Sequence, residues 1–104
     1  MANAVGMIEV YGLVAAFVAG DAGCKAANVT IETFDRNKPA NADKLDVPLI
    51  IMVKFRGSVE DVTAAVEAAE IAANKVSGVI TKHIIARPEK DIEKLLAISG
   101  LDKN

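Results

Sequence analysis

The sequence has very few of the residues on which metal sites, disulfides and most catalysis depend. Its 104 residues include one cysteine, Cys24, and one histidine, His83. A single cysteine forms no internal disulfide and is too few for a metal site within one chain. An enzyme needs convergent acid, base or nucleophilic groups, whereas His83 lies in a strand-like segment between Lys82 and Ile84. We therefore predict no catalytic residue, no metal site and no cofactor.

Long apolar runs and blocks of like charge are also missing. No stretch approaches the 18 or more apolar residues of a membrane span, and the N-terminus lacks the basic and apolar parts of a signal peptide. The twelve Lys and Arg residues are spread along the chain, and the formal net charge is −2. Such a distribution argues against a nucleic-acid surface. We expect a cytoplasmic protein with no nucleic-acid partner and no membrane partner.

Apolar residues are plentiful, although few of them are aromatic. They make up 52% of the chain, which has no Trp, one Tyr and three Phe, so the core has to be aliphatic. The length fits one domain. We predict a single domain over residues 1–98, followed by a flexible tail over residues 99–104.

The most apolar stretch, residues 47–57, predicts a central strand over residues 49–56. Its apolar side chains alternate between two faces, with Leu49, Ile51, Val53 and Phe55 on one and Ile50 and Met52 on the other. A strand that is apolar on both faces lies inside a sheet and is covered on both sides. Lys54 and Arg56 are expected to reach water where the strand ends. Ser58 and Asp61 form an approximate capping pair at the start of the next helix.

The remaining segments complete an alternating pattern. Strands are expected over residues 4–11, 28–34 and 79–85, and helices over residues 13–27, from Ser58 to Gly78, and over residues 89–98. The order β-α-β-β-α-β plus a terminal helix predicts an α+β, ferredoxin-like domain with a four-stranded, mixed or antiparallel sheet and helices largely on one side.

Two finer expectations concern packing and the longest loop. In the first helix we expect a buried line at Leu13, Phe17, Gly20 and Cys24, with Gly20 and Gly23 letting a neighbour approach closely. Residues 35–46 form a polar loop without glycine, longer than the two to five residues usual in a hairpin. Loops of this length are commonly functional. From the residues alone, two classes stay open: a self-assembling building block, and a small cytoplasmic oligomeric regulatory module that binds a small-molecule effector.

Four motifs, taken together in order and spacing, narrow this choice. They are Gly6-Met-Ile-Glu, Lys25-Ala-Ala-Asn-Val, Arg56-Gly-Ser-Val and Ile85-Ala-Arg-Pro. With them the chain resembles the bacterial microcompartment shell proteins (BMC domain), in their single-domain, hexamer-forming class. The resemblance implies a non-catalytic, hexameric tile with a central pore, which packs with other shell proteins around encapsulated enzymes in the cytoplasm.

The resemblance also assigns roles to particular residues. It places Lys25, Asn28 and Arg87 at the edge where hexamers meet. It places the loop between the second and third strands at the pore, which gives the pore loop Asp35, Arg36, Asn37, Lys38, Pro39, Ala40 and Asn41. The common family members have a short turn with glycine and serine there, so the extended loop predicts a gated or plugged pore. Because this loop has no cysteine, an iron–sulfur cluster is not expected.

Overall fold

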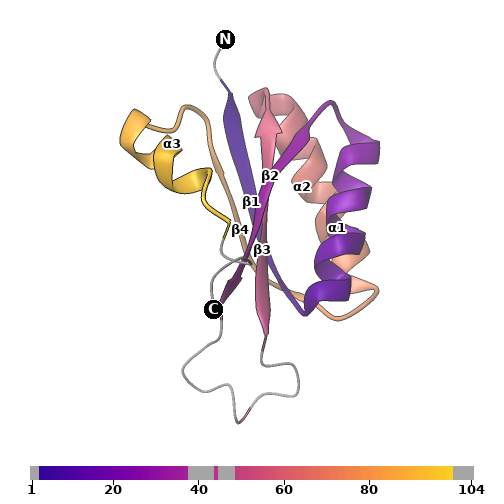
Figure 1. The fold of residues 1–104 in the computed structure, drawn as a ribbon. Coiled ribbons are helices and arrows are strands. Elements are labelled where there is room, and N and C mark those ends of the chain that lie inside the picture. The colour runs from indigo at the N-terminus through magenta and orange to yellow at the C-terminus, as the bar shows by residue number, and fades with distance from the viewer. Residues whose placement is uncertain (1–2, 38–43, 45–48, 100–104) are drawn as a thin grey trace.

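The computed structural model describes residues 3–37, 44 and 49–99, and its ribbon is shown in Figure 1. The elements are β1 (Ala4–Tyr11), α1 (Leu13–Ala26), β2 (Thr30–Asn37), β3 (Ile50–Gly57), α2 (Val59–Asn74), β4 (Val79–Ile85) and α3 (Lys90–Leu96). The predicted α+β order is confirmed. The boundary of the tail remains a prediction, since residues 100–104 lie outside the described ones and Ser99, the last of these, donates a hydrogen bond from its hydroxyl to the Phe34 carbonyl at 3.2 Å.

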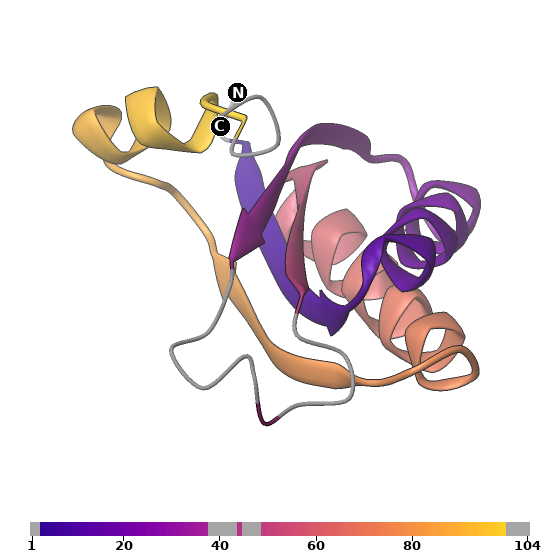
Figure 2. The same ribbon diagram turned by 60° about the horizontal axis from the view of Figure 1, so that its bottom comes forward.

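The four strands form one antiparallel sheet in the order β2-β3-β1-β4. β3 is an interior strand, as its two apolar faces predicted, and β2 and β4 are the edges. At one end of the sheet Ala4 pairs with Gly57, and at the other end Tyr11 pairs with Ile50. The helices are split between the faces: α1 and α2 cover one face and α3 lies on the other (Figures 1 and 2). The two long helices therefore lie on one side, as predicted, and only the short helix α3 lies on the other.

The main core lies between the sheet and the helix pair α1 and α2. Its fully buried side chains include Ile8 and Val10 on β1, Ile51, Val53 and Phe55 on β3, and Val62, Ala65, Ala69 and Ala73 on α2. Burying a side chain such as Val, Ile or Phe stabilises a fold by roughly 1.5–3 kcal/mol. This aliphatic core is what the composition predicted, and it fixes the sheet against the two long helices.

The predicted buried line of α1 is wrong for three of its four residues. Gly20 is buried, whereas Leu13, Phe17 and Cys24 are exposed, Phe17 by 59%. The buried positions are small: Ala15, Ala16, Ala19, Gly20 and Gly23. These small residues let α1 approach α2 and the sheet closely. The line of larger apolar residues, Leu13, Phe17 and Cys24, then lies above the β2 edge of the sheet. The expected role of the glycines in close packing holds at Gly23, where a Cβ would lie 2.5 Å from Phe55 Cζ.

Strand β2 extends further than predicted. Residues 35–37 were assigned to the loop, but Asp35, Arg36 and Asn37 pair with Met52, Ile51 and Ile50. An edge strand has one side open to water, so polar residues can continue it as long as its partner strand offers backbone hydrogen bonds. The rest of the expected loop, residues 38–46, lies outside the described residues except for Lys44.

The end of β3 also differs from its prediction. Lys54 was expected to reach water, but it is only 2% exposed. α3 covers this face of the sheet, and carbonyl groups at its C-terminal end accept hydrogen bonds from Lys54. α3 itself buries one large residue, Leu96, while Ile92 and Leu95 are exposed.

The predicted cap of α2 is confirmed and gives a first testable result. The Ser58 hydroxyl oxygen accepts a hydrogen bond from the Asp61 N–H at 3.0 Å. Ser58→Ala should lower the free energy of unfolding by about 1 kcal/mol, because this N–H then has no capping acceptor. Urea unfolding at fixed protein concentration measures the change. Ser58→Thr keeps the acceptor and should retain most of the stability, and equal midpoints for the Ala variant and the parent would contradict the role of this cap.

Candidate assembly surfaces

The one histidine and the one cysteine lie on different elements. His83 on β4 and Cys24 on α1 are both exposed. Within the part of the chain that the structure describes, no group of three or more His, Cys, Asp and Glu side chains could hold a metal ion. Among the same residues, no helix has the length and apolar character needed to cross a bilayer. The motifs of the sequence point instead to surfaces that another protein chain can contact.

The three predicted edge residues lie at one end of the sheet. Lys25 lies in the last turn of α1 and Asn28 precedes β2, whose first residue pairs with Arg56, while Arg87 follows β4. All three are exposed. Lys25 Nζ lies 2.8 Å from Asp21 Oδ2, and both side chains are mostly in water. The hydrogen bond that Lys25 donates to Asp21, together with the charge of that carboxylate, raises the pKa of Lys25 above the usual lysine value, so the ammonium stays charged throughout the neutral range.

The described part of the predicted pore segment lies at the opposite end. Arg36 and Asn37 are exposed, and Asp35 Oδ2 lies 2.7 Å from Lys54 Nζ. Lys38, Pro39, Ala40 and Asn41 lie outside the described residues. β2 has eight residues, so about 23 Å of strand separates the two predicted sites. One subunit therefore presents its two predicted sites at the two ends of one sheet.

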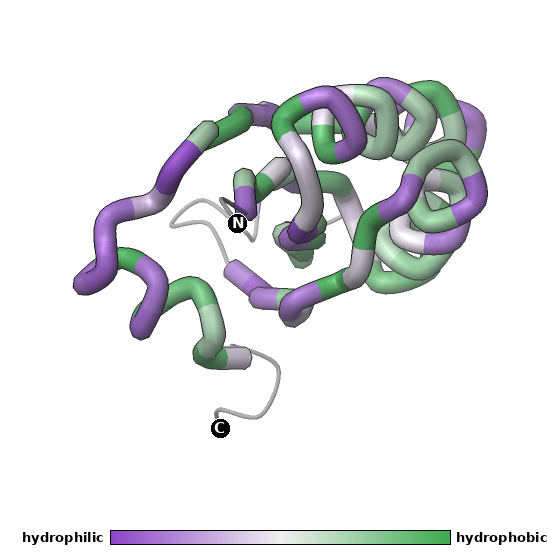
Figure 3. The backbone as a smooth tube through the Cα atoms, turned by 90° about the horizontal axis from the view of Figure 1, so that it is seen from above, coloured by the Kyte–Doolittle hydropathy of each residue, from purple (hydrophilic) through white to green (hydrophobic). Residues whose placement is uncertain are grey.

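An apolar surface follows the β2 edge, and we call it the β2-side surface. It consists of Leu13, Phe17 and Cys24 on α1 and Ile31 on β2. The Phe17 ring packs at a tilt on the buried Phe34 ring, with centroids 5.3 Å apart, and its other side is open. Figure 3 shows that hydrophobic residues occur along the outer helices as well as in the sheet. An apolar line on a subunit edge is a candidate contact for another chain.

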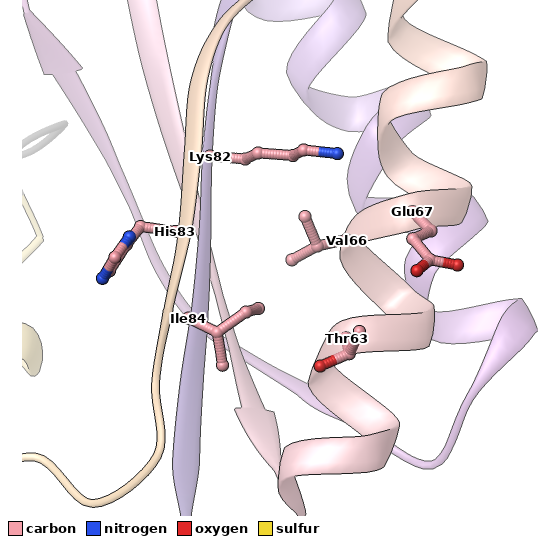
Figure 4. Close-up of a pocket in the computed structure, with 6 residues that line it drawn as sticks. All are labelled: Thr63, Val66, Glu67, Lys82, His83 and Ile84. Atoms are coloured by element: carbon pink, nitrogen blue, oxygen red, sulfur yellow. The ribbon is translucent and has the colours of Figure 1, made fainter.

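A groove follows the opposite edge, and with Ile80 we call it the β4-side surface. The groove lies between α2 and β4, has a volume of about 180 Å³ and is lined by Thr63, Val66, Glu67, Lys82, His83 and Ile84. Lys82 and Ile84 point toward α2, whereas His83 points to the other face of the sheet (Figure 4). Lys82 Nζ lies 2.6 Å from Glu70 Oε1, and Ile80 is 38% exposed. This edge therefore combines a hollow and apolar side chains with an ion pair at its border.

The sequence did not predict either surface. Periodicity identified Leu13 and Phe17 as apolar positions of one helical line but assigned them to the interior. The signal that could have corrected this is the second, smaller line at Ala15, Ala19 and Gly23, spaced by four residues. A line of small residues favours the closest helix contact, which leaves the larger residues for another partner.

The comparisons with known proteins agree with this description of a subunit built for assembly. A family model described as the BMC domain matches residues 4–88. The chain belongs to the BMC domain family. This match covers every strand of the sheet together with α1 and α2.

Individual relatives of this BMC domain are shell proteins. The chain is 39% identical over 100 residues to the carboxysome shell protein CcmK2 of Synechocystis sp. (strain ATCC 27184 / PCC 6803 / Kazusa), covering 94% of this chain and 88% of that one. It is 39% identical over 94 residues to the bacterial microcompartment shell protein PduA of Citrobacter freundii, covering 90% and 91% of the two chains. These relatives do not favour the regulatory module.

A solved structure shares the fold. The crystal structure of a microcompartments protein from Desulfitobacterium hafniense DCB superposes with a TM-score of 0.71 at 21% identity, over 93% of this chain. The match spans 48% of that protein's length, so this chain corresponds to about half of it. At this identity the likeness supports the fold of the BMC domain alone.

Proposed function

We propose that this chain is a structural shell subunit of a bacterial microcompartment, which assembles into a homo-hexameric tile with a central pore and packs with other shell proteins. It is not an enzyme, and its folded unit is a single domain over residues 1–98. The observation that supports the proposal is that two different candidate contact surfaces lie on opposite edges of one sheet.

Two different surfaces on opposite edges of a subunit favour assembly of the subunits into a ring. The β2-side surface carries a largely exposed aromatic ring, and the β4-side surface carries a groove. If the β2-side surface of one copy meets the β4-side surface of the next, each copy uses both surfaces, and a head-to-tail contact of this kind closes into a ring when the rotation allows it. Aromatic side chains that fill a hollow commonly dominate the binding energy of such contacts. The number of six copies comes from the family resemblance.

If the ring forms through the β2 and β4 edges of each subunit, the two ends of each sheet occupy different positions in the ring. One end of each sheet then faces the axis and the other faces the perimeter. We assign Arg36 and Asn37 to the axis and Lys25, Asn28 and Arg87 to the perimeter, because the resemblance gives these motifs those positions. The prediction of a gated or plugged pore concerns mainly Lys38, Pro39, Ala40 and Asn41, which lie outside the described residues, and it stays a prediction.

The edge assignment is tested by substituting Lys25. Lys25→Ala and Lys25→Asp should abolish the packing of hexamers into sheets and leave the hexamers intact, because polar groups of the neighbouring tile that receive the ammonium lose their partner. Electron micrographs show the sheets, and light scattering gives the mass of the hexamers. A matched control is Lys94→Ala, since Lys94 is 78% exposed in an ion pair with Asp91, close to the 75% of Lys25. Sheets that persist in both Lys25 variants would show that the assigned role is wrong.

A further inference from the structure

The face of the sheet under α3 holds a buried cation that the proposed function does not use. Lys54, on the interior strand β3, has a side chain that is 2% exposed. Its ammonium group lies 2.7 Å from Asp35 Oδ2 and donates hydrogen bonds to the carbonyl oxygens of Leu96 at 2.7 Å and Ile98 at 3.3 Å. An ammonium group has three donors, and these three contacts account for all of them.

The three partners come from two segments that are far apart in the sequence. Asp35 is the third residue from the end of β2. The Leu96 and Ile98 carbonyls lie at the C-terminal end of α3, where backbone carbonyls lack helical partners and the helix dipole favours a positive charge. The side chain of Lys54, on β3, therefore caps α3 and pairs with β2 at the same time.

The other contacts of α3 with the sheet are mostly polar as well. Arg56, two residues along β3, donates a hydrogen bond to Glu93 Oε2 at 2.6 Å and lies 3.7 Å from Glu32 Oε1. The Thr33 hydroxyl lies 3.4 Å from the Leu96 carbonyl. Leu96 is the one large apolar residue of α3 that is buried. Because α3 buries only one large apolar residue of its own, its position depends strongly on the polar groups that contact Lys54 and Arg56.

We propose that Lys54 couples two parts of the subunit, and we call this coupling the interlock. Through this side chain, the packing of α3 on the sheet and the position of the last residues of β2, Asp35 to Asn37, depend on each other. If α3 moves away, the ammonium loses its carbonyl partners and its pairing with Asp35 changes. If the end of β2 moves, the charge under α3 loses its carboxylate. A partner that contacts α3 then affects the strand end that leads into residues 38–48. Only the location of this strand end at the axis rests on the proposed function, whereas the coupling is a property of the subunit.

Hydrogen–deuterium exchange of the assembled, full-length protein tests the interlock. Asp35→Asn should speed exchange in the peptide covering α3 by at least about ten-fold, because the capping cation loses its anionic partner and α3 opens more often. Asp21→Asn is the matched control, since it makes the same chemical change in the ion pair of an exposed residue on α1. This control should leave exchange in α3 unchanged.

Two further measurements distinguish coupling between α3 and β2 from a general loss of stability. One perturbs α3 and follows exchange in β2, and the other uses a double variant. Glu93→Gln, which weakens the contact of α3 with Arg56, should speed exchange in the peptide that covers Asp35 to Asn37. In a Lys54→Met background, Asp35→Asn should have no further effect on α3, because the link is already gone. Unchanged exchange in α3 of the single Asp35→Asn variant would overturn the interlock, as would fully additive effects in the double variant. If Lys54→Met fails to fold, the Asp35→Asn and Glu93→Gln variants still show whether α3 and the end of β2 are coupled. Light scattering on the same samples reports hexamer formation separately.

Discussion

Phe17→Arg is expected to convert the assembled protein into single, folded subunits. The side chain is 59% exposed in the subunit, so the fold tolerates a charge there. In the proposed ring the same position enters the groove of the next copy, where a guanidinium group would lose its hydration and the aromatic ring that fills the hollow would be missing. Loss of an aromatic anchor alone typically costs 2 kcal/mol or more per interface, which is about a 30-fold loss of affinity. Sedimentation velocity at micromolar concentration measures the shift in mass.

Two further variants make this result specific to a head-to-tail ring. Ile71→Arg is the control, because Ile71 is 62% exposed on α2 and lies on the side of that helix opposite its buried line, away from both strand edges. It should keep the hexamer. Ile80→Arg disrupts the β4-side surface instead and should also give single subunits. Mixing the Phe17 and Ile80 variants restores one intact contact per pair, so dimers and no larger rings should form at high concentration. A Phe17→Arg protein that keeps the mass of the hexamer would contradict the assigned contact.

Gly23→Ala is expected to destabilise the subunit by about 1–3 kcal/mol, the usual cost of overpacking a core. An added Cβ would lie 2.5 and 2.6 Å from two ring atoms of Phe55 and 3.1 Å from the backbone oxygen of Ala65. Phe55 is fully buried, so its ring cannot move away without disturbing the core between α1 and the sheet. The free energy of unfolding, measured by urea denaturation at fixed protein concentration, gives the change.

Gly20→Ala is the matched control for this substitution. It adds the same methyl group to the same helix, but the nearest atom, Ile31 Cδ1 at 2.9 Å, is the end of a flexible side chain at an exposed position. Replacing glycine by alanine inside a helix also gains roughly 1 kcal/mol of helix propensity. The Gly20 variant should therefore be about as stable as the parent or more stable. Equal unfolding midpoints for the two variants would contradict the close packing inferred at Gly23.

The fold could be predicted largely because its strands and helices have clear local signals. The strands at Ala4–Tyr11 and Val79–Ile85 were predicted with the observed bounds, since alternation and flanking glycine or proline define both. β2 was misplaced because its last residues, Asp35 to Asn37, are polar, and an edge strand accepts polar residues that an interior strand would not. Periodicity indicates which residues share a face of a strand. It does not indicate whether that strand lies at the edge of the sheet, because the strand order depends on the tertiary fold.

The candidate sites were predictable only where a motif carried them. The edge residues Lys25, Asn28 and Arg87 came from the resemblance, and the structure adds that they are exposed and at one end of the sheet. Phe17 was misassigned because an apolar line looks the same in the sequence whether its own sheet or another subunit covers it. Lys54 was misassigned for a related reason: its cover and its carbonyl partners come from α3, about 40 residues later in the chain, which local alternation on β3 cannot reveal.

The most direct test of the proposed function is the mass of the unmodified protein in solution. Multi-angle light scattering during size-exclusion chromatography should give about 65 kDa at micromolar concentration, six times the 10.9 kDa of one chain. A mass corresponding to one or to three chains would contradict the hexameric tile.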